Sequence, residues 1–218
     1  MRQLLLDLLP ETPPSLDNFV AGGNGEALTG LAAWLAPDNR ETSLLLWGEA
    51  GAGKTHLLRA SEAAYCDAAL DADLATIEHS AAAHAIDHVE ALSESGQIAL
   101  FNLFNRLRAA GGRLLTAASR PPRQLTVRED LRTRLGSGLI YRVHALSDDE
   151  KIAALTQQAA ARGMRLAPES FDYLLARAPR DMRSLAALLV ALDRYSLEYK
   201  RAITLPLLRE VLHHPLET

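Results

Sequence analysis

The sequence is short of cysteine, lysine and aromatic residues, and neither sign of charge dominates it. Its single cysteine, Cys66, cannot form an internal disulfide and no zinc-type cluster accompanies it, so we expect a reducing, cytoplasmic environment. The formal net charge of −4 argues against strong direct binding of nucleic acid, because surfaces built for that purpose are normally basic. No apolar run approaches the length of a membrane-spanning helix. What remains is a chain of 218 residues, 48% hydrophobic, with material for one domain and an appendage or for two small domains.

Lysine occurs at only three positions, and one of them, Lys54, ends a glycine-rich segment that follows an apolar run. The spacing Gly48-x4-Gly53-Lys54-Thr55 is typical of a phosphate-binding loop. In such a loop, backbone N–H groups surround a polyphosphate, the ammonium contacts the outer phosphates and the threonine hydroxyl binds Mg²⁺. The N-terminus of the following helix adds its positive dipole end. The alternative, a glycine-rich surface turn, is disfavoured because a strand and a helix are expected on the two sides of the motif.

The first 15 residues have the composition of a short peptide on a tether. A leucine-rich hexad over residues 3–8 precedes Pro10, Pro13 and Pro14, and proline-rich segments are stiff and extended. Exposed apolar residues on a tether commonly occupy a groove on a partner. An N-terminal strand or turn folded onto the rest of the protein is an equally good interpretation of the pattern alone.

Residues 16–146 alternate helical and strand patterns, which predicts an α/β domain of three layers with a parallel sheet between helices. The expected helices cover residues 26–35, 55–65, 97–109 and 130–135, and the expected strands cover residues 44–47, 83–87, 113–118 and 139–143, with a weak candidate at 74–77. From Ser147 the pattern changes to helices only, beginning with the capping box Ser147-Asp148-Asp149-Glu150. Residues 147–218 therefore form a small all-helical domain, with helices expected at 148–162, 168–177, 181–199 and 205–213.

Five further residues are candidates for a nucleotide site. Asp87 ends an apolar strand, where a P-loop protein places the acid that orients Mg²⁺; an ordinary helix N-cap is the alternative. His88 follows in the position where hydrolytic P-loop enzymes commonly carry a second acid, so intrinsic hydrolysis should be slow. We interpret His88 as a solvated surface residue or a weak water-positioning group, and Glu90 as a poor substitute for the second acid. Arg134 and Arg183 are placed where a cation could reach phosphate, although a surface role is the alternative for each in a chain with 20 arginines.

Taken together, these motifs resemble the AAA+ ATPases, and within them the module shared by the replication initiator DnaA and its regulator Hda. Gly48–Thr55 is similar to the Walker A motif of that family and Ile86-Asp87 to its Walker B motif. The segment from Leu114 to Pro122 is similar to its sensor 1 strand and the Arg-Pro-Pro that follows, with Thr116 or Ser119 as the polar residue in place of the usual acid. The resemblance covers nearly the whole chain.

The resemblance implies roles for particular residues. Asp130–Leu135 resembles the arginine-finger box, which makes Arg134 a catalytic residue acting in trans, and residues 180–185 resemble the sensor 2 helix. Phe19 and Val20, with Gly22 and Asn24, look like the segment that leads into the adenine pocket. The implied cofactor is ADP or ATP with Mg²⁺, the metal being served by Thr55 and Asp87. The full nucleotide-binding set would be Phe19, Val20, Gly48, Gly51, Ala52, Gly53, Lys54, Thr55, His56, Asp87 and Arg183.

Two features favour the Hda-type proteins over DnaA. The sequence stops at Thr218, whereas DnaA carries a DNA-binding helix-turn-helix domain after its lid. The hexad at residues 3–8 fits the Hda-type clamp-binding form Gln-Leu-x-Leu-x-Leu, with contacts from Gln3, Leu4, Leu6 and Leu8.

This resemblance implies a nucleotide-bound regulator that docks on the sliding clamp (β subunit) and uses Arg134 to stimulate hydrolysis of DnaA-bound ATP, inactivating the initiator. Its own ATPase activity would be weak or absent. A self-hydrolysing AAA+ ATPase of the helicase-loader or DnaA-paralogue type is the alternative, and self-association is left open.

Overall fold

The computed structural model describes residues 13–78, 80–179, 181–199 and 203–213. Its described part divides into two compact units, one spanning Pro13–Ala145 and the other beginning at Leu146. We refer to them as the body and the lid. None of the described helices combines the length and the apolar character that a membrane crossing requires. The hexad at residues 3–8 lies outside the described residues.

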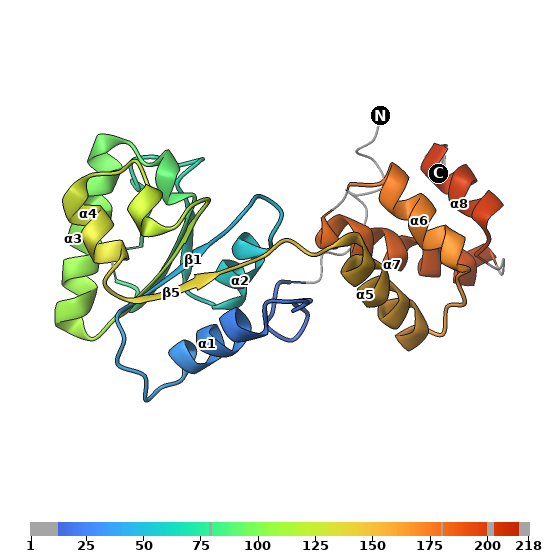
Figure 1. Cartoon of the computed structure of the whole chain (residues 1–218), viewed down its shortest axis with the longest axis horizontal. Helices are drawn as coiled ribbons and strands as arrows, with labels where there is room; N and C mark the ends of the chain where they lie inside the picture. Colours follow the sequence, from blue (N-terminus) through green and yellow to red (C-terminus); the bar gives the residue numbers. More distant parts are fainter. Residues whose placement is uncertain (1–12, 79, 180, 200–202, 214–218) are drawn as a thin grey trace. The chain divides into compact units, whose positions relative to one another are not determined.

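The body is built on a five-stranded sheet in the order β2-β3-β4-β1-β5, with every neighbouring pair parallel (Figure 1). Strand β1, with the sequence Ser-Leu-Leu-Leu-Trp, lies between β4 and β5 and is buried over four of its five residues, as a strand covered on both faces must be. The structure confirms the α/β class. The strands are β1 (Ser43–Trp47), β2 (Ala64–Asp67), β3 (Ala83–Asp87), β4 (Arg113–Ala118) and β5 (Leu139–Arg142).

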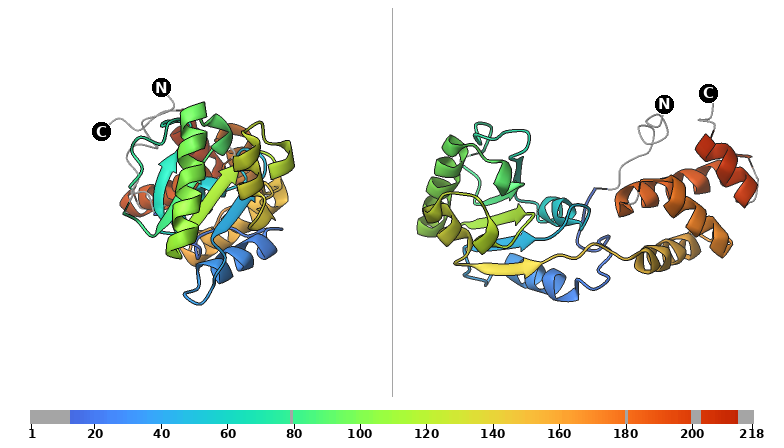
Figure 2. Two further views of the ribbon diagram at one scale, coloured as in Figure 1. Left: turned by 90° about the vertical axis from the view of Figure 1, so that its left-hand side faces the viewer. Right: turned by 45° about the horizontal axis from the view of Figure 1, so that its top comes forward.

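Helices cover both faces of the sheet (Figures 1 and 2). Leu45 points into one apolar cluster with the side chains of α3 (Glu94–Ala110) and α4 (Glu129–Leu135). Leu44 and Leu46 point the other way, into a second cluster with α1 (Gly25–Leu35) and α2 (Lys54–Ala60). This alternation follows from the two-residue period of a strand. Two short helical turns, η1 (Val89–Ala91) and η2 (Pro122–Gln124), follow β3 and β4.

The region between the loop and β3 differs from the prediction. The helix expected at 55–65 ends at Ala60, and after a turn the chain enters β2, which the sequence did not indicate. The turn contains Glu62 in a left-handed conformation with φ 57° and no glycine to signal it. The weak strand candidate at 74–77 is wrong, because that segment forms turns. β2 pairs with β3 in the register that sets Asp67 beside Asp87, so both strands end at the same edge.

The lid contains the four predicted helices among its described residues. The capping box is present: the Ser147 hydroxyl accepts a hydrogen bond from the Glu150 N–H at 3.2 Å, and Glu150 Oε2 accepts one from the Ser147 N–H at 2.7 Å. Leucines from all four helices make up most of the buried core. The helices are α5 (Asp148–Ala161), α6 (Pro168–Arg177), α7 (Met182–Tyr199) and α8 (Leu205–His213).

Candidate functional site

The glycine-rich loop lies between the end of β1 and the start of α2. Gly51 and Gly53 have φ of 77° and 95°, values that residues with a side chain rarely adopt. A Cβ on Gly53 would lie 2.7 Å from the Phe19 ring, and one on Gly48 would lie 2.0 Å from the Val143 carbonyl oxygen. A Cβ on Gly51 would meet nothing. The loop is therefore pressed against the body at both ends and open at its centre, as a phosphate cradle requires.

Lys54 is the first residue of α2 and its side chain turns back into the loop. Its ammonium donates hydrogen bonds to the carbonyl oxygens of Gly48 at 2.7 Å and Glu49 at 2.8 Å. Burial lowers the pKa of Lys54, and the negative charges of Asp87 and Glu90 oppose that shift. The ammonium is thus held at the loop, where it can exchange carbonyl oxygens for phosphate oxygens.

Asp87, at the end of β3, is fully buried and meets the loop helix. Its Oδ2 accepts hydrogen bonds from the Thr55 hydroxyl at 2.6 Å and from the Tyr65 hydroxyl at 3.2 Å. The Thr55 and Asp87 side chains, 32 residues apart in sequence, thus lie together as a Mg²⁺ site needs. Burial, with the charge of Asp87, raises the pKa of Tyr65 to about 12, so Tyr65 stays protonated and donates. Asp87 is not the N-cap of the helical turn that follows it, because His88 occupies the N-cap position of η1.

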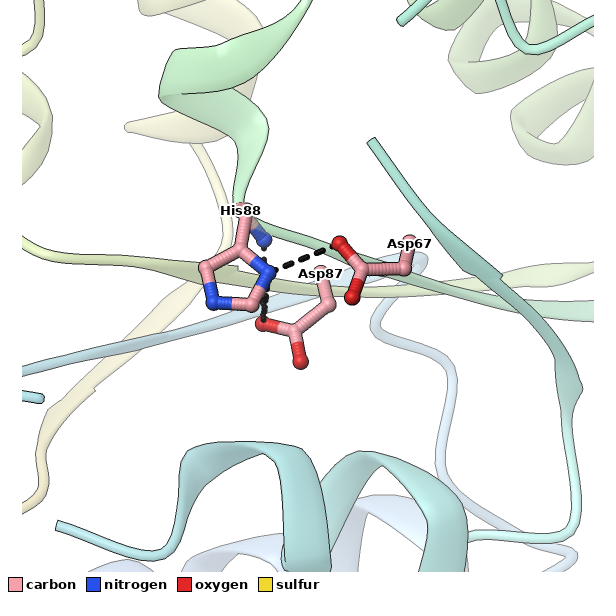
Figure 3. Close-up of side chains that lie close together, drawn as sticks. All are labelled: Asp67, Asp87 and His88. Carbon is pink, nitrogen blue, oxygen red and sulfur yellow. Dashed lines mark hydrogen bonds and ion pairs between the residues drawn. The ribbon is translucent and has the colours of Figure 1, made fainter. Parts of the chain in front are cut away.

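His88 is partly exposed, and its imidazole is hydrogen-bonded to a neighbouring strand end. Its side chain is 43% exposed, and Nδ1 lies 2.8 Å from Oδ1 of Asp67 and 3.8 Å from Oδ1 of Asp87 (Figure 3). Burial lowers the pKa of His88, but the hydrogen bond with Asp67 and the surrounding carboxylates outweigh it, so the pKa lies above its ordinary value. The imidazole is therefore tied to the end of β2.

Glu90 forms a contact that sequence reasoning missed. Its Oε1 accepts a hydrogen bond from the Ser119 N–H at 3.0 Å, immediately after β4, and its charge acts on Lys54. Thr116, the other sensor 1 candidate, is buried, and its hydroxyl lies 3.5 Å from the Leu44 carbonyl oxygen inside the sheet. At the carboxyl end of β4, the Glu90 carboxylate therefore holds the backbone of Ser119.

The segment before α1 is attached to the loop helix and to β5. The Phe19 and His56 rings lie 5.5 Å apart, and His56 Nε2 lies 2.9 Å from the Ser15 carbonyl oxygen. Asn24 is buried, and its amide makes both hydrogen bonds to the backbone of His144. Phe19 and His56 thus lie beside the loop. Val20 follows Phe19 in the chain, and Ala52 is part of the loop.

Arg134, in the last turn of α4, is half-buried against α3. Its guanidinium carbon lies 5.7 Å from the ring centres of both Phe101 and Phe104. Among the described residues no carboxylate pairs with it. Arg183 lies near the start of α7 in the lid, and its side chain is exposed. The four clamp-peptide residues lie outside the described part of the chain.

Tyr65, which bonds to Asp87, and Asp67, which bonds to His88, are two partners that sequence reasoning missed. Both belong to β2, which the sequence pattern merged with the preceding helix. The signal that could have found them is their two-residue separation in a short segment, with the apolar Cys66 between them. Without the partner strand this signal is too short to predict a strand.

Comparison with known proteins gives matches to both units. The model of the Hda lid domain matches residues 148–212. An uncharacterised protein of Haemophilus influenzae is 31% identical over 229 residues, covering 97% of this chain and 99% of that protein. Domain III of the replication initiation protein DnaA from Thermotoga maritima has a TM-score of 0.70 at 20% identity, covering 93% of this chain and 97% of that one. AMPPCP-bound DnaA from Aquifex aeolicus has a TM-score of 0.66 at 23% identity, covering 86% and 69%.

The chain belongs to the Hda-like, DnaA-related AAA+ proteins. Its parallel sheet with covering helices matches the fold of the DnaA domain, and its helical lid matches the Hda lid model. Membership of the Hda-like family associates the chain with DnaA-dependent control of DNA replication.

Proposed function

We propose that this Hda-like protein holds an adenine nucleotide and stimulates hydrolysis of ATP bound to DnaA by supplying Arg134 in trans. The observation that carries the proposal is the state of Arg134. Its guanidinium lies against two aromatic rings, is half-buried and pairs with no carboxylate among the described residues. A buried cation is normally paired, whereas an arginine finger must keep its charge available for phosphoryl oxygens on another molecule.

The nucleotide would bind at the loop of the body. The backbone of Gly51 and Gly53 offers N–H groups, the Lys54 ammonium is already at the loop, and the Thr55–Asp87 pair would hold Mg²⁺. Bound Mg²⁺ would neutralise phosphate charge and fix the nucleotide. Support also comes from the AMPPCP-bound DnaA of Aquifex aeolicus, which shares the fold. We propose Phe19, Val20, Ala52 and His56 as further contacts in the body, and Arg183 as the nucleotide-sensing arginine of the lid.

The arginine-finger proposal is tested by Arg134→Ala, with Arg132→Ala as the matched control. Arg132 lies on the same helix two residues earlier, with its guanidinium 4.0 Å from the exposed carboxylate of Glu129. We expect Arg134→Ala to lower stimulated hydrolysis of DnaA-bound ATP by about 10³-fold or more, with ADP affinity and thermal stability retained. Arg132→Ala should leave stimulation unchanged. Equal stimulation by wild type and Arg134→Ala would refute the proposal.

We further propose that the sliding clamp is the platform for this reaction and that Gln3, Leu4, Leu6 and Leu8 contact it. The support is the match of residues 3–8 to the clamp-binding form. The double substitution Gln3→Ala with Leu6→Ala should abolish clamp binding, measured by surface plasmon resonance with immobilised clamp. Leu5→Ala, at a variable position of the same peptide, should bind as wild type does. Undiminished binding of the double variant would remove the clamp from the proposal.

A second candidate function, self-hydrolysis of ATP, is favoured by Glu90. This carboxylate is anchored by the Ser119 N–H and acts on Lys54, so the site has an acid beside the loop despite His88. A steady-state ATPase assay on the isolated protein separates the two functions. Turnover on the order of 1 s⁻¹ that is abolished by Glu90→Gln would favour this candidate, and negligible turnover would favour activation of the partner.

A further inference from the structure

A group of three side chains lies at the carboxyl edge of the sheet beside the proposed nucleotide site. Asp67 ends β2, Asp87 ends β3 and His88 follows directly (Figure 3). Each of the three residues offers one ligand atom, a carboxylate oxygen or an imidazole nitrogen, and these three atoms lie within 4.8 Å of one another. The strand register sets the two aspartates side by side, so the group results from the fold and not from a single loop.

The two oxygens of Asp87 face different partners. Oδ2 accepts the hydroxyl hydrogen bonds of Thr55 and Tyr65, on the side of the loop helix. Oδ1 accepts the His88 N–H at 2.9 Å and faces Nδ1 of that imidazole at 3.8 Å. A cation bound through Oδ1 would therefore lie on the His88 side of Asp87, away from the Thr55 hydroxyl.

We propose that Asp67, Asp87 and His88 bind a divalent transition-metal ion, such as Mn²⁺ or Zn²⁺, in the absence of nucleotide. Ligands about 2.0–2.2 Å from one metal are about 3–3.5 Å from each other. The imidazole nitrogen is 2.8 Å from one carboxylate oxygen and 3.8 Å from the other. Small movements of the three side chains would therefore bring all three ligand atoms within bonding distance of one ion.

The ligand set selects the class of metal. An imidazole nitrogen suits Zn²⁺ and related transition-metal ions and the two carboxylates suit Mn²⁺, whereas Mg²⁺ prefers oxygen ligands alone and retains several waters. Two carboxylates carry a charge of −2, which one dication neutralises while the imidazole is neutral.

The surroundings of the three ligands suit a metal site. The Asp67 Oδ1 also accepts the Ala69 N–H at 2.9 Å, and such hydrogen bonds fix the orientation of metal-ligating carboxylates. The His88 side chain is 43% exposed and that of Asp67 is 18% exposed. An ion therefore has a path from solvent, and open coordination positions can be filled by water.

The test uses the full chain, freed of nucleotide and metal, and titrates it with Mn²⁺ alone. The adjacent His213 and His214 could bind metal on their own, so all proteins carry His213→Asn and His214→Asn. Electron paramagnetic resonance of free Mn²⁺ gives affinity and stoichiometry, and pulsed measurements detect a coordinated imidazole nitrogen. We expect one Mn²⁺ per chain, with an imidazole signal, that excess Mg²⁺ displaces poorly.

Two variants and one control decide the assignment. Asp67→Asn and His88→Asn should each weaken Mn²⁺ binding at least tenfold, and His88→Asn should remove the nitrogen signal. Asparagine tolerates the left-handed backbone of position 88, where φ is 51°. His144→Asn, which removes an exposed histidine elsewhere in the body, should bind as the parent does. Absence of one-to-one binding in the parent would overturn the proposal, and so would unchanged binding by Asp67→Asn or His88→Asn.

These measurements test the metal site and the proposed nucleotide site separately. Asp67→Asn keeps the Thr55–Asp87 pair, so its affinity for ADP with Mg²⁺ should equal that of wild type. If Mn²⁺ binding fails in the parent while ADP binding is retained, only the metal proposal falls. If ADP binding fails while Mn²⁺ binds, only the nucleotide proposal falls.

Discussion

The body and the lid differ in what they bury. Most of the buried polar or charged side chains in the described residues belong to the body, and two of them, Lys54 and Asp87, belong to the proposed nucleotide site. The lid buries one, Ser170, within a core made mainly of leucine. Polar groups are costly to bury without hydrogen bonds, and those of Lys54, Asp87 and Asn24 are bonded. The body therefore buries charged groups inside its fold, whereas the lid is stabilised by packing and carries Arg183, the proposed nucleotide-sensing residue, at its surface.

The largest expected effect tests whether the lid core is independent of the body. Leu189→Ala removes a fully buried side chain from the lid core and should lower lid stability by about 2–5 kcal/mol. Both tryptophans, Trp34 and Trp47, belong to the body, so their fluorescence follows the body alone. Circular dichroism also follows the lid helices. We expect the dichroism transition of Leu189→Ala to move to lower urea while the fluorescence transition stays in place.

Leu197→Ala is the control for this measurement, because Leu197 is on the same helix but is 73% exposed. It should shift neither transition appreciably. Equal shifts of both transitions in Leu189→Ala would show that the two units unfold together, and the contrast between them would then not extend to stability.

The next effect tests whether buried charge in the body serves ligand binding. Lys54→Ala removes the ammonium that would contact the phosphates, and one charge-assisted hydrogen bond is worth about 1.5–3 kcal/mol, so ADP binding should weaken by about 10- to 100-fold. Lys151→Ala changes a lid lysine that contacts Asp148 at 3.3 Å and should leave ADP affinity as it is. Isothermal titration calorimetry measures both. An ADP affinity of Lys54→Ala close to that of wild type would contradict the assignment of the loop.

The smallest effect compares a helix cap in each unit. Ser147→Ala removes the N-cap of α5 and should cost about 1 kcal/mol, seen as faster amide exchange in the lid. In the body, the N-cap Ser93 bonds to the Gly96 N–H and also to Asp73. Ser93→Ala should therefore cost more than Ser147→Ala, because it also removes one of the hydrogen bonds that hold Asp73, the other coming from Ser95. A larger loss for Ser147→Ala would reverse this comparison.

The sequence predicted the elements whose patterns are local. The strands at 83–87 and 113–118 and the four lid helices appear at or within two residues of the expected bounds, because apolar spacing and caps mark them. The strand β2 escaped prediction, since its four residues continue a helix-favouring segment and a left-handed Glu62 breaks the helix without glycine.

Only the site residues that belong to a local sequence motif could be predicted. The loop spacing placed Lys54 and Thr55 together, and the end of an apolar strand indicated Asp87. The bonds of Asp87 with Tyr65, of His88 with Asp67 and of Glu90 with Ser119 join strand ends that are neighbours only in the folded sheet. Pairing order and register decide such contacts, and neither is written in a local pattern.

The side-chain amide of Asn24 bonds to the backbone close to the end of the body. It donates to the His144 carbonyl oxygen at 2.9 Å and accepts from the His144 N–H at 2.7 Å, 120 residues away in sequence. The backbone is therefore clamped through residue 144, and the next unit begins only two residues later. The same asparagine belongs to the segment that carries Phe19, so a side chain near the start of the body holds the body's last residues in place.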